Sequence, residues 1–308
     1  LLGQRVQNLY GGPLIVPPPR VYFERPKARK VRVAGVETVS SVTERETVDP
    51  SSSNVTIDLS LDRKRVGNLW FPVFLAAYQG QYTYDIEAIP EAFRSGPLLL
   101  VPGLNSSESI FRGIEFKIND VAVEPLAKLI SNAAIDLHPT QYVDGKLVVA
   151  LRYETTGTNH LLYLLSNPDQ RRNSGEGVGQ ANAVGQERLT RVDDFSLEVT
   201  TNFFKYTFPE RTIPYTTLRQ DKGRSIFVWR FDQAVTGKNI GLVIPEELNP
   251  GNIASRIAFF APVSLLFFFV VVTIFGILVK NSLHPMHYAL LSASFLSFLL
   301  TFSYSADH

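Results

Sequence analysis

The feature that most constrains this chain is an uncharged apolar run of about 22 residues, Ala258 to Val279. As an α-helix rising about 1.5 Å per residue, such a run reaches across a hydrocarbon core of roughly 30 Å. Arg256 precedes the run and Lys280 follows it, so charged side chains stand only at its two ends, where they can reach water. We therefore expect a transmembrane helix over residues 257–279, with Pro262 in its first turn or two.

A second apolar run, Met286 to Ala306, follows a short polar link. It contains hydroxyl residues, which are typical of a helix that packs on other helices: Ser292, Ser294, Ser297, Thr301 and Ser303. We expect a second transmembrane helix over residues 286–306, so that the two runs form a hairpin. The alternative is a pair of buried core helices, but such helices rarely exceed about 18 residues without a charge.

The composition of the chain is an average over two different regions. The hydrophobic content of 45 % combines an ordinary polar region, up to about residue 250, with the apolar C-terminal part. The net charge of +1 excludes a global field that would recruit nucleic acid. The sequence has no cysteine, which excludes disulfides, thiolate catalysis and cysteine-ligated metals.

The orientation in the membrane is weakly marked. The link between the two runs carries Lys280 with His284 and His287, a weak positive-inside signal. A large domain outside the cytoplasm needs an export signal, yet the printed sequence opens without an apolar run. We expect an upstream signal or membrane span before Leu1, and the same kind of continuation after His308.

Residues 1–28 are expected to be extended and irregular. The segments Gly11-Gly12-Pro13 and Pro17-Pro18-Pro19 disfavour helix and favour a polyproline-like backbone. A basic run overlaps the end of this segment: Arg20, Arg25, Lys27, Arg29 and Lys30. We favour a solvated strand edge for these cations. The alternative is a contact with lipid headgroups or an acidic partner.

Residues 29–250 show a period of two and are predicted to form a β-rich domain. Val55 to Asp62 alternates between apolar and polar residues without a fault. Leu69 to Tyr84 is predicted to be a bent aromatic strand, with Pro72 and Gly80 as bulge or edge points. Asn119-Asp120 predicts a hairpin turn. Four further strands are expected at Lys146 to Tyr153, Phe195 to Thr201, Ser225 to Phe231 and Asn239 to Ile244.

Many short strands and few helices predict an all-β fold, an antiparallel sandwich rather than βαβ units. The pattern leaves open whether there is one sandwich or two, divided near residue 140. Residues 125–133 could form about two helical turns. Residues 167–186 are polar with four glycines, and they are expected to be a long loop or mobile insertion. The GEGVG within it lacks the strand, helix and Lys-Ser/Thr of a phosphate-binding loop.

A search for catalytic or metal-binding residues predicts none, and no cofactor. His284 and His287 are three residues apart, so on a helix they would share a face and could ligate a metal or tetrapyrrole; we favour anchoring at the membrane boundary. His138 and His160 are expected in turns. The paired carboxylates Asp193-Asp194 and Glu246-Glu247 are adjacent, so their side chains should diverge. Asn54 and Asn105 fit the glycosylation sequon, which matters only in a eukaryotic host.

Several segments resemble the CreD family of inner-membrane proteins. The similarity is strongest from Leu248 to His308, through LNPGNIASRIAFFAPVSLLFFF, LHPMHYALL and the closing Ala306-Asp307-His308. Between residues 10 and 202 it is weaker: YGGPLIVP is similar to the family's GPxLxVP segment, and Val55–Tyr84 and Asp193–Asn202 are similar to its strands. The resemblance implies a bacterial inner-membrane protein with a periplasmic β-rich domain, associated with envelope stress and colicin tolerance and without established enzymatic activity. The printed sequence differs from that family's pattern at both ends, since it includes no N-terminal span and stops after the second C-terminal one, as expected of a truncated or repurposed relative.

These observations predict a non-enzymatic protein of the bacterial inner membrane with its large N-terminal domain in the periplasm. It would act by contact, as a structural or accessory subunit of a larger respiratory, photosynthetic or transport complex. Its expected partners are lipid and other integral membrane subunits, reached through the hairpin and the β-domain, and not nucleic acid. The alternative is a CreD-like envelope-stress factor that acts alone, and a minor alternative is a tethered periplasmic hydrolase.

Overall fold

The computed structural model of the chain describes residues 2–33, 36–66, 69–94, 96–104, 109–123, 133–137, 145–165, 189–245, 250–278 and 284–305. Two compact units divide the chain. The first consists of Leu1–Arg63 and Pro72–Pro245, and the second of Lys64–Phe71 and Glu246–His308. The first unit, which holds most of the β-rich region, has no division near residue 140.

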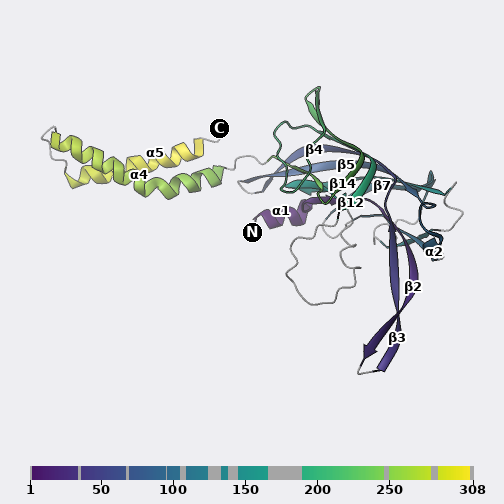
Figure 1. Cartoon of the computed structure of the whole chain (residues 1–308). Coiled ribbons are helices and arrows are strands. Elements are labelled where there is room, and N and C mark those ends of the chain that lie inside the picture. The colour runs from purple at the N-terminus through teal and green to yellow at the C-terminus, as the bar shows by residue number, and fades with distance from the viewer. Residues whose placement is uncertain are drawn as a thin grey trace. The chain divides into compact units, whose positions relative to one another are not determined.

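The described elements are mainly strands, which confirms the all-β fold class of the N-terminal region (Figure 1). In chain order they are α1 (Leu2–Tyr10), β1 (Leu14–Val16), β2 (Arg20–Val33), β3 (Val36–Val48), β4 (Ser52–Val66), β5 (Leu69–Asp85), α2 (Glu91–Arg94), β6 (Leu98–Val101), β7 (Phe111–Ile118), β8 (Val121–Ala122), β9 (Ile135–Leu137), β10 (Lys146–Thr158), β11 (His160–Tyr163), β12 (Thr190–Thr201), β13 (Thr217–Asp221), β14 (Arg224–Thr236), β15 (Ile240–Val243), α4 (Pro250–Leu278) and α5 (Pro285–Ser305).

Three sheets organise these strands. The largest has eight strands in the order β13-β14-β12-β4-β5-β10-β7-β8, the second has the order β3-β2-β6-β9, and the third the order β1-β11-β15. Most of the described pairings are antiparallel, as expected. Two strand pairs are parallel, β12 with β4 and β1 with β11, and they depart from the antiparallel sandwich that the sequence predicts. Each joins strands far apart in sequence, for which local alternation carries no directional signal.

One hydrophobic core joins the three sheets. Alternate residues of β4, β5, β10 and β12 contribute one face of the large sheet, and β1, β2, β6, β11 and β15 contribute the apolar residues packed in the same cluster. Trp229 of β14 and Phe74 of β5 are completely buried within it. The period of two in the sequence therefore marks a sheet with one face in the core and the other exposed.

The Asn119-Asp120 turn is confirmed. Both residues have positive φ angles, 45° and 64°, and they connect β7 to β8, which pair in an antiparallel manner. Positive φ at both central residues is the conformation of a type I′ hairpin turn, which Asn and Asp tolerate better than other non-glycine residues.

The N-terminal segment contains a helix, whereas the sequence predicts that residues 1–28 are extended and irregular. Residues Leu2–Tyr10 form α1, in which Val6 is buried, and β2 already begins at Arg20. Gly11 ends the helix: its φ is 96° and its N–H donates to the Gln7 carbonyl at 2.8 Å. The Gly11-Gly12-Pro13 signal is therefore a helix C-terminus, where glycine and a following proline are common, rather than a mark of irregular chain.

Gly80 is neither a bulge nor an edge, contrary to the prediction for β5. Its strand pairs continuously with β10, with Gly80 opposite Leu151. The rings of Tyr78 and Tyr82 close over it, and a Cβ atom there would lie 2.9 Å from Tyr82 Cε2 and clash with Tyr78 Oη. Glycine is required because two aromatic rings occupy the space of its side chain.

Replacing Gly80 with alanine is expected to lower the free energy of unfolding by about 1–3 kcal/mol, the usual cost of overpacking a core. The reason is that the Tyr78 and Tyr82 rings must move apart to admit the methyl group. Thermal or denaturant unfolding measures the loss. Gln81→Ala is the matched control, since Gln81 is exposed on the other face, and its effect should stay within about 0.5 kcal/mol. Equal stability of both variants would contradict this packing.

Strands β2 and β3 continue beyond the sheet as a two-stranded ribbon (Figure 1). In the described part of the chain, β6 pairs only with Arg20–Phe23 of β2, whereas the pairing with β3 continues to Val33. The basic run thus lies largely in this ribbon, in agreement with a strand edge. Lys27, Arg29 and Lys30 are opposite Val42, Ser40 and Val39, none of which carries a charge.

Some predictions lie outside the described residues. The long loop over residues 167–186 and nearly all of the two-turn helix over 125–133 are among them.

Candidate functional site

Helices α4 and α5 are the elements that the sequence marks most strongly for function. Both begin with proline, Pro250 and Pro285, at the position where a missing backbone donor costs least. They pack through aromatic rings: Phe268 stacks on Phe295 with ring centroids 5.2 Å apart, and Phe269 meets Tyr288 edge-on at 5.8 Å. The expected pair of C-terminal helices is therefore present, with α4 starting earlier than residue 257.

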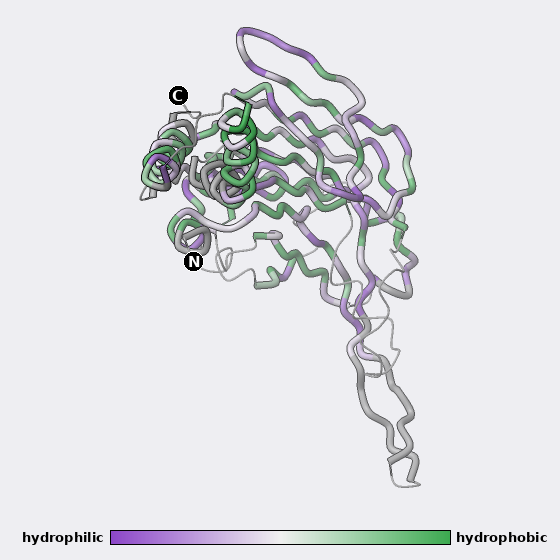
Figure 2. Tube along the Cα trace, turned by 90° about the vertical axis from the view of Figure 1, so that its left-hand side faces the viewer, coloured by the Kyte–Doolittle hydropathy of each residue, from purple (hydrophilic) through white to green (hydrophobic). Residues whose placement is uncertain are grey.

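Apolar side chains are exposed along both helices. Figure 2 colours the trace by hydropathy and shows hydrophobic residues in green along the C-terminal helices. In α4 they are Phe259, Phe260, Val263, Leu266, Phe267, Val270, Val271, Ile274, Phe275, Ile277 and Leu278, and in α5 they are Met286, Leu290, Leu296, Phe298 and Leu300. Each is more than two-fifths exposed. An apolar surface of this extent marks a contact with a membrane or with another protein.

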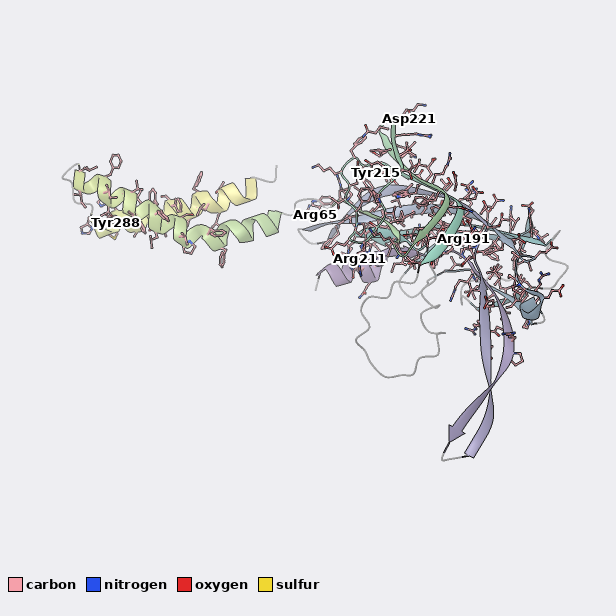
Figure 3. The ribbon with its side chains drawn as sticks, in the orientation of Figure 1. Arg65, Arg191, Arg211, Tyr215, Asp221 and Tyr288 are labelled. Carbon is pink, nitrogen blue, oxygen red and sulfur yellow. The ribbon has the colours of Figure 1, made fainter. Side chains whose placement is uncertain are left out.

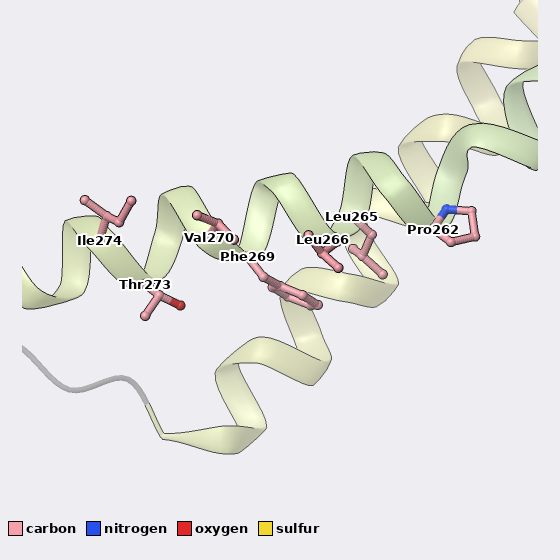
Figure 4. Close-up of a pocket in the computed structure, with 7 residues that line it drawn as sticks. All are labelled: Pro262, Leu265, Leu266, Phe269, Val270, Thr273 and Ile274. Carbon is pink, nitrogen blue, oxygen red and sulfur yellow. The ribbon is translucent and has the colours of Figure 1, made fainter.

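A shallow hollow of about 460 Å³ runs along one side of α4 (Figure 4). Its lining follows helical spacing: Pro262, Leu265, Leu266, Phe269, Val270, Thr273 and Ile274. Pro262 lies in the interior of α4 rather than in its first turns, because the helix begins at Pro250. An interior proline cannot donate to the carbonyl of the residue four positions earlier, Ala258.

The hydroxyl groups of α5 bond within their own helix. Ser292 Oγ donates to the Tyr288 carbonyl at 2.7 Å, and Ser294 Oγ to the Leu290 carbonyl at 3.0 Å. Thr301 Oγ1 donates in the same way at 2.8 Å, to a carbonyl four residues earlier. These hydroxyls are satisfied without a partner helix, so their presence alone does not require one.

Among helix segments whose side chains the structure describes, none reaches the length and mean hydropathy of a membrane span.

His284 and His287 are neighbours at the start of α5. The ring centroids are 6.4 Å apart and nearly perpendicular, and the His287 backbone N–H donates to the His284 carbonyl at 2.8 Å. His284 immediately precedes Pro285, where the helix begins. Among the described residues, no group of three or more His, Asp or Glu could hold a metal ion. His308, the last residue of the chain, is not described.

The Asp193-Asp194 pair diverges as expected. Asp193 forms an ion pair with Arg191 at 2.8 Å (Arg191 is labelled in Figure 3), whereas Asp194 Oδ2 accepts a hydrogen bond from Ser52 Oγ at 2.7 Å. Each carboxylate is thus engaged with a different neighbour in the β-rich unit. Glu246 and Glu247 lie outside the described residues.

His160 is in a strand rather than in the expected turn. It opens β11 opposite Val243, directly after Asn159, whose φ is 66°. Partial burial lowers the pKa of the His160 imidazole, so the ring is neutral at pH 7. His138 and the sequon residue Asn105 are not described, and Asn54 is exposed in β4.

A chain of buried tyrosine hydroxyls crosses the core, which sequence reasoning did not predict. Tyr82 of β5 bonds to Tyr78 of the same strand at 2.5 Å, and to Tyr163 of β11 at 2.9 Å. Tyr84 donates to the Pro19 carbonyl at 2.7 Å, and Tyr153 stacks on Tyr78 at 4.7 Å. The hydroxyls therefore link the eight-stranded sheet to the three-stranded sheet and to the segment before β2.

Burial of these phenols raises the pKa of Tyr78, Tyr82, Tyr84, Tyr153 and Tyr163. The nearby Tyr163 raises the pKa of the other four further. All five are therefore neutral at physiological pH. Tyr78, Tyr82, Tyr84 and Tyr163 form hydrogen bonds within the core, and Tyr153 packs there through its ring. A signal was available in the sequence: tyrosines at 78, 82 and 84 share the inward alternation of β5.

No protein-family model matches the chain, and no curated protein is significantly similar to it. The resemblance to the CreD family thus stays a prediction that rests on the quoted segments.

Proposed function

We propose that α4 and α5 anchor this protein in a membrane as a helical hairpin, and that the β-rich unit acts there by contact, as an accessory subunit of a larger membrane complex. The observation that carries the proposal is the exposure of large apolar side chains along both helices. Exposed phenylalanines such as Phe259 and Phe267 are costly in water and favourable in lipid or against another apolar helix.

The sequence gives this proposal its membrane setting. The run Ala258 to Val279 has no charge, and hydroxyls such as Ser292 are bonded to their own helix, as a hydrocarbon environment requires. By resemblance to the CreD family, the membrane is a bacterial inner membrane and the β-rich unit lies in the periplasm.

The contact role is supported by the polar groups of the β-rich unit, which are engaged in interactions within the protein. Its buried tyrosines are engaged in packing and in hydrogen bonds between sheets, and the sequence-adjacent carboxylates Asp193 and Asp194 have separate partners. These groups therefore have structural tasks.

Native electrophoresis of membranes solubilised in a mild detergent tests the accessory role. We expect the chain to migrate with larger subunits in a discrete band. Migration only as a free monomer would contradict the proposal. The second candidate, an envelope-stress factor acting alone, rests on the CreD resemblance. It predicts instead that deletion changes detergent or colicin sensitivity without destabilising any complex.

A further inference from the structure

A polar groove of about 270 Å³ lies on the exposed face of the eight-stranded sheet. It crosses four neighbouring strands, β4, β5, β10 and β7. Its polar lining consists of Asn54, Thr56, Gln79, Gln81, Glu115, Lys117 and Arg152, around Gly80, Ala150 and Leu151. All seven polar residues are exposed.

Ala150 is the reason for the hollow. In the paired strands, Ala150 stands opposite Gln81 on one side and Lys117 on the other, and the next outward row places Arg152 between Gln79 and Glu115. Long side chains therefore surround one methyl group on the open face of the sheet. The opposite face at this point is closed by Leu151, which is buried.

The polar side chains of the groove are available to a ligand. Within the described part of the chain, none of the seven side chains makes a hydrogen bond or ion pair, although Arg152 and Glu115 are directly opposite in register. Elsewhere on the same sheet such groups are engaged, as in the Arg224–Asp58 pair at 2.8 Å. The groove thus presents available donors and acceptors around one small site.

A β-bulge adjoins the groove. The register of β7 against β10 shifts between Arg152 and Glu154, and Gly113 of β7 has a φ of 56° at this point. Bulges redirect side chains and are over-represented beside functional sites. This bulge lies next to the Glu115–Arg152 pair, so it influences the direction of these two side chains on the exposed face.

We propose that this groove binds a small acidic saccharide, a sugar unit that carries a carboxylate. The amides of Asn54, Gln79 and Gln81 each offer a hydrogen-bond donor and an acceptor. Sugar hydroxyls also donate and accept, so the two sets of groups can pair. Arg152 and Lys117 supply charge-assisted bonds to a carboxylate. Glu115 accepts hydroxyl donors and limits the groove to a net charge of +1, which disfavours multiply charged phosphates.

The size of the groove agrees with such a ligand. At roughly 30 Å³ for each water, the groove holds about nine water molecules, which a ligand would displace. Its volume is slightly below the ~300 Å³ at which sites for drug-sized ligands begin. This inference concerns the β-rich unit alone, so it does not depend on the proposed accessory role.

Titration calorimetry on the full chain tests the inference, in a detergent without a sugar headgroup. The probes are the disaccharide N-acetylglucosaminyl-N-acetylmuramic acid and di-N-acetylchitobiose, which lacks the carboxylate. We expect the acidic disaccharide to bind at least about tenfold more tightly, the gain typical of a charge-assisted hydrogen bond. Absence of binding by both probes, or equal affinity for the two, would overturn the assignment.

Three variants locate the binding. Ala150→Leu fills the hollow without altering a charge and should abolish binding of both probes. Arg152→Gln should remove most of the preference for the acidic probe. Arg230→Gln is the matched control, because Arg230 is exposed on the same sheet in β14, outside the groove, and its affinities should equal the wild type. Unfolding temperatures near the wild-type value show that the variants fold. Undiminished binding by a folded Ala150→Leu chain would refute the site.

Discussion

Replacing Val270 and Val271 together with arginine is expected to release the protein from membranes. Both side chains are about half exposed near the middle of the uncharged run in α4. An arginine at the centre of a membrane helix costs about 2.5–3.5 kcal/mol on insertion scales, so the two together cost about 5–7 kcal/mol. A penalty of this size should shift most of the chain out of the membrane fraction.

Flotation of membranes in a density gradient after a high-salt wash measures this effect. Two controls separate charge from position. Val270→Leu with Val271→Leu keeps the run apolar and should float like the wild type. Val121→Arg with Leu189→Arg adds the same two charges at exposed apolar positions of the β-rich unit and should also float. If the Val270/Val271 arginine variant floats as fully as these controls, α4 does not lie in lipid.

The β-rich unit is expected to unfold cooperatively between about pH 10 and 12. Burial raises the pKa of five tyrosines, of which Tyr82 and Tyr163 share a hydrogen bond. Above the ordinary phenol pKa of about 10, the unfolded chain loses protons that the folded chain retains, so the free energy of unfolding falls as pH rises. At pH 11 the loss is about 1.4 kcal/mol for each tyrosine, or about 7 kcal/mol for five, which is comparable to the whole stability of a typical domain.

Tyrosinate absorbance and far-ultraviolet circular dichroism, followed together against pH, test this expectation. The five phenols should ionise only as secondary structure is lost, whereas exposed tyrosines titrate near pH 10. Tyr153→Phe is an informative variant, because it keeps the ring that stacks on Tyr78 and removes one ionisation. It should change stability little at pH 7 and lessen the loss at pH 11 by about 1.4 kcal/mol. Smooth ionisation of every tyrosine near pH 10 in a folded chain would contradict the buried network.

Local patterns predicted much of the β-rich unit. The fault-free alternation of Val55 to Asp62 lies within β4, and Asn119-Asp120 forms the predicted turn. In each case the signal is contained in a few adjacent residues, so it does not depend on which strands pair. The helical runs at the C-terminus were found for the same reason.

Features that depend on pairing could not be predicted in this way. Gly80 suggests a bulge in sequence, yet it pairs with Leu151 like any other strand residue. Glycine is needed there because the Tyr78 and Tyr82 rings close over it. The groove around Ala150 exists only because the register places Lys117 and Gln81 opposite that alanine. The same holds for the bond between Tyr82 and Tyr163, which lie 81 residues apart. Alternation shows which face a residue occupies but not which residues stand beside it.

The amphipathic helix α1 was missed for a different reason. Among the side chains of α1 that the structure describes, Val6 is the buried apolar one, and the glycines that end the helix also mark irregular chain. Short helices of this kind are stabilised by packing rather than by intrinsic propensity.

Purification of the full chain in a gentle detergent, followed by mass spectrometry of the proteins that accompany it, tests the central proposal most directly. An accessory subunit anchored by α4 and α5 should bring a defined set of integral membrane proteins in fixed stoichiometry. The Val270/Val271 arginine variant should lose them. Recovery of the chain alone from the same membranes would contradict the accessory role and favour a factor that acts by itself.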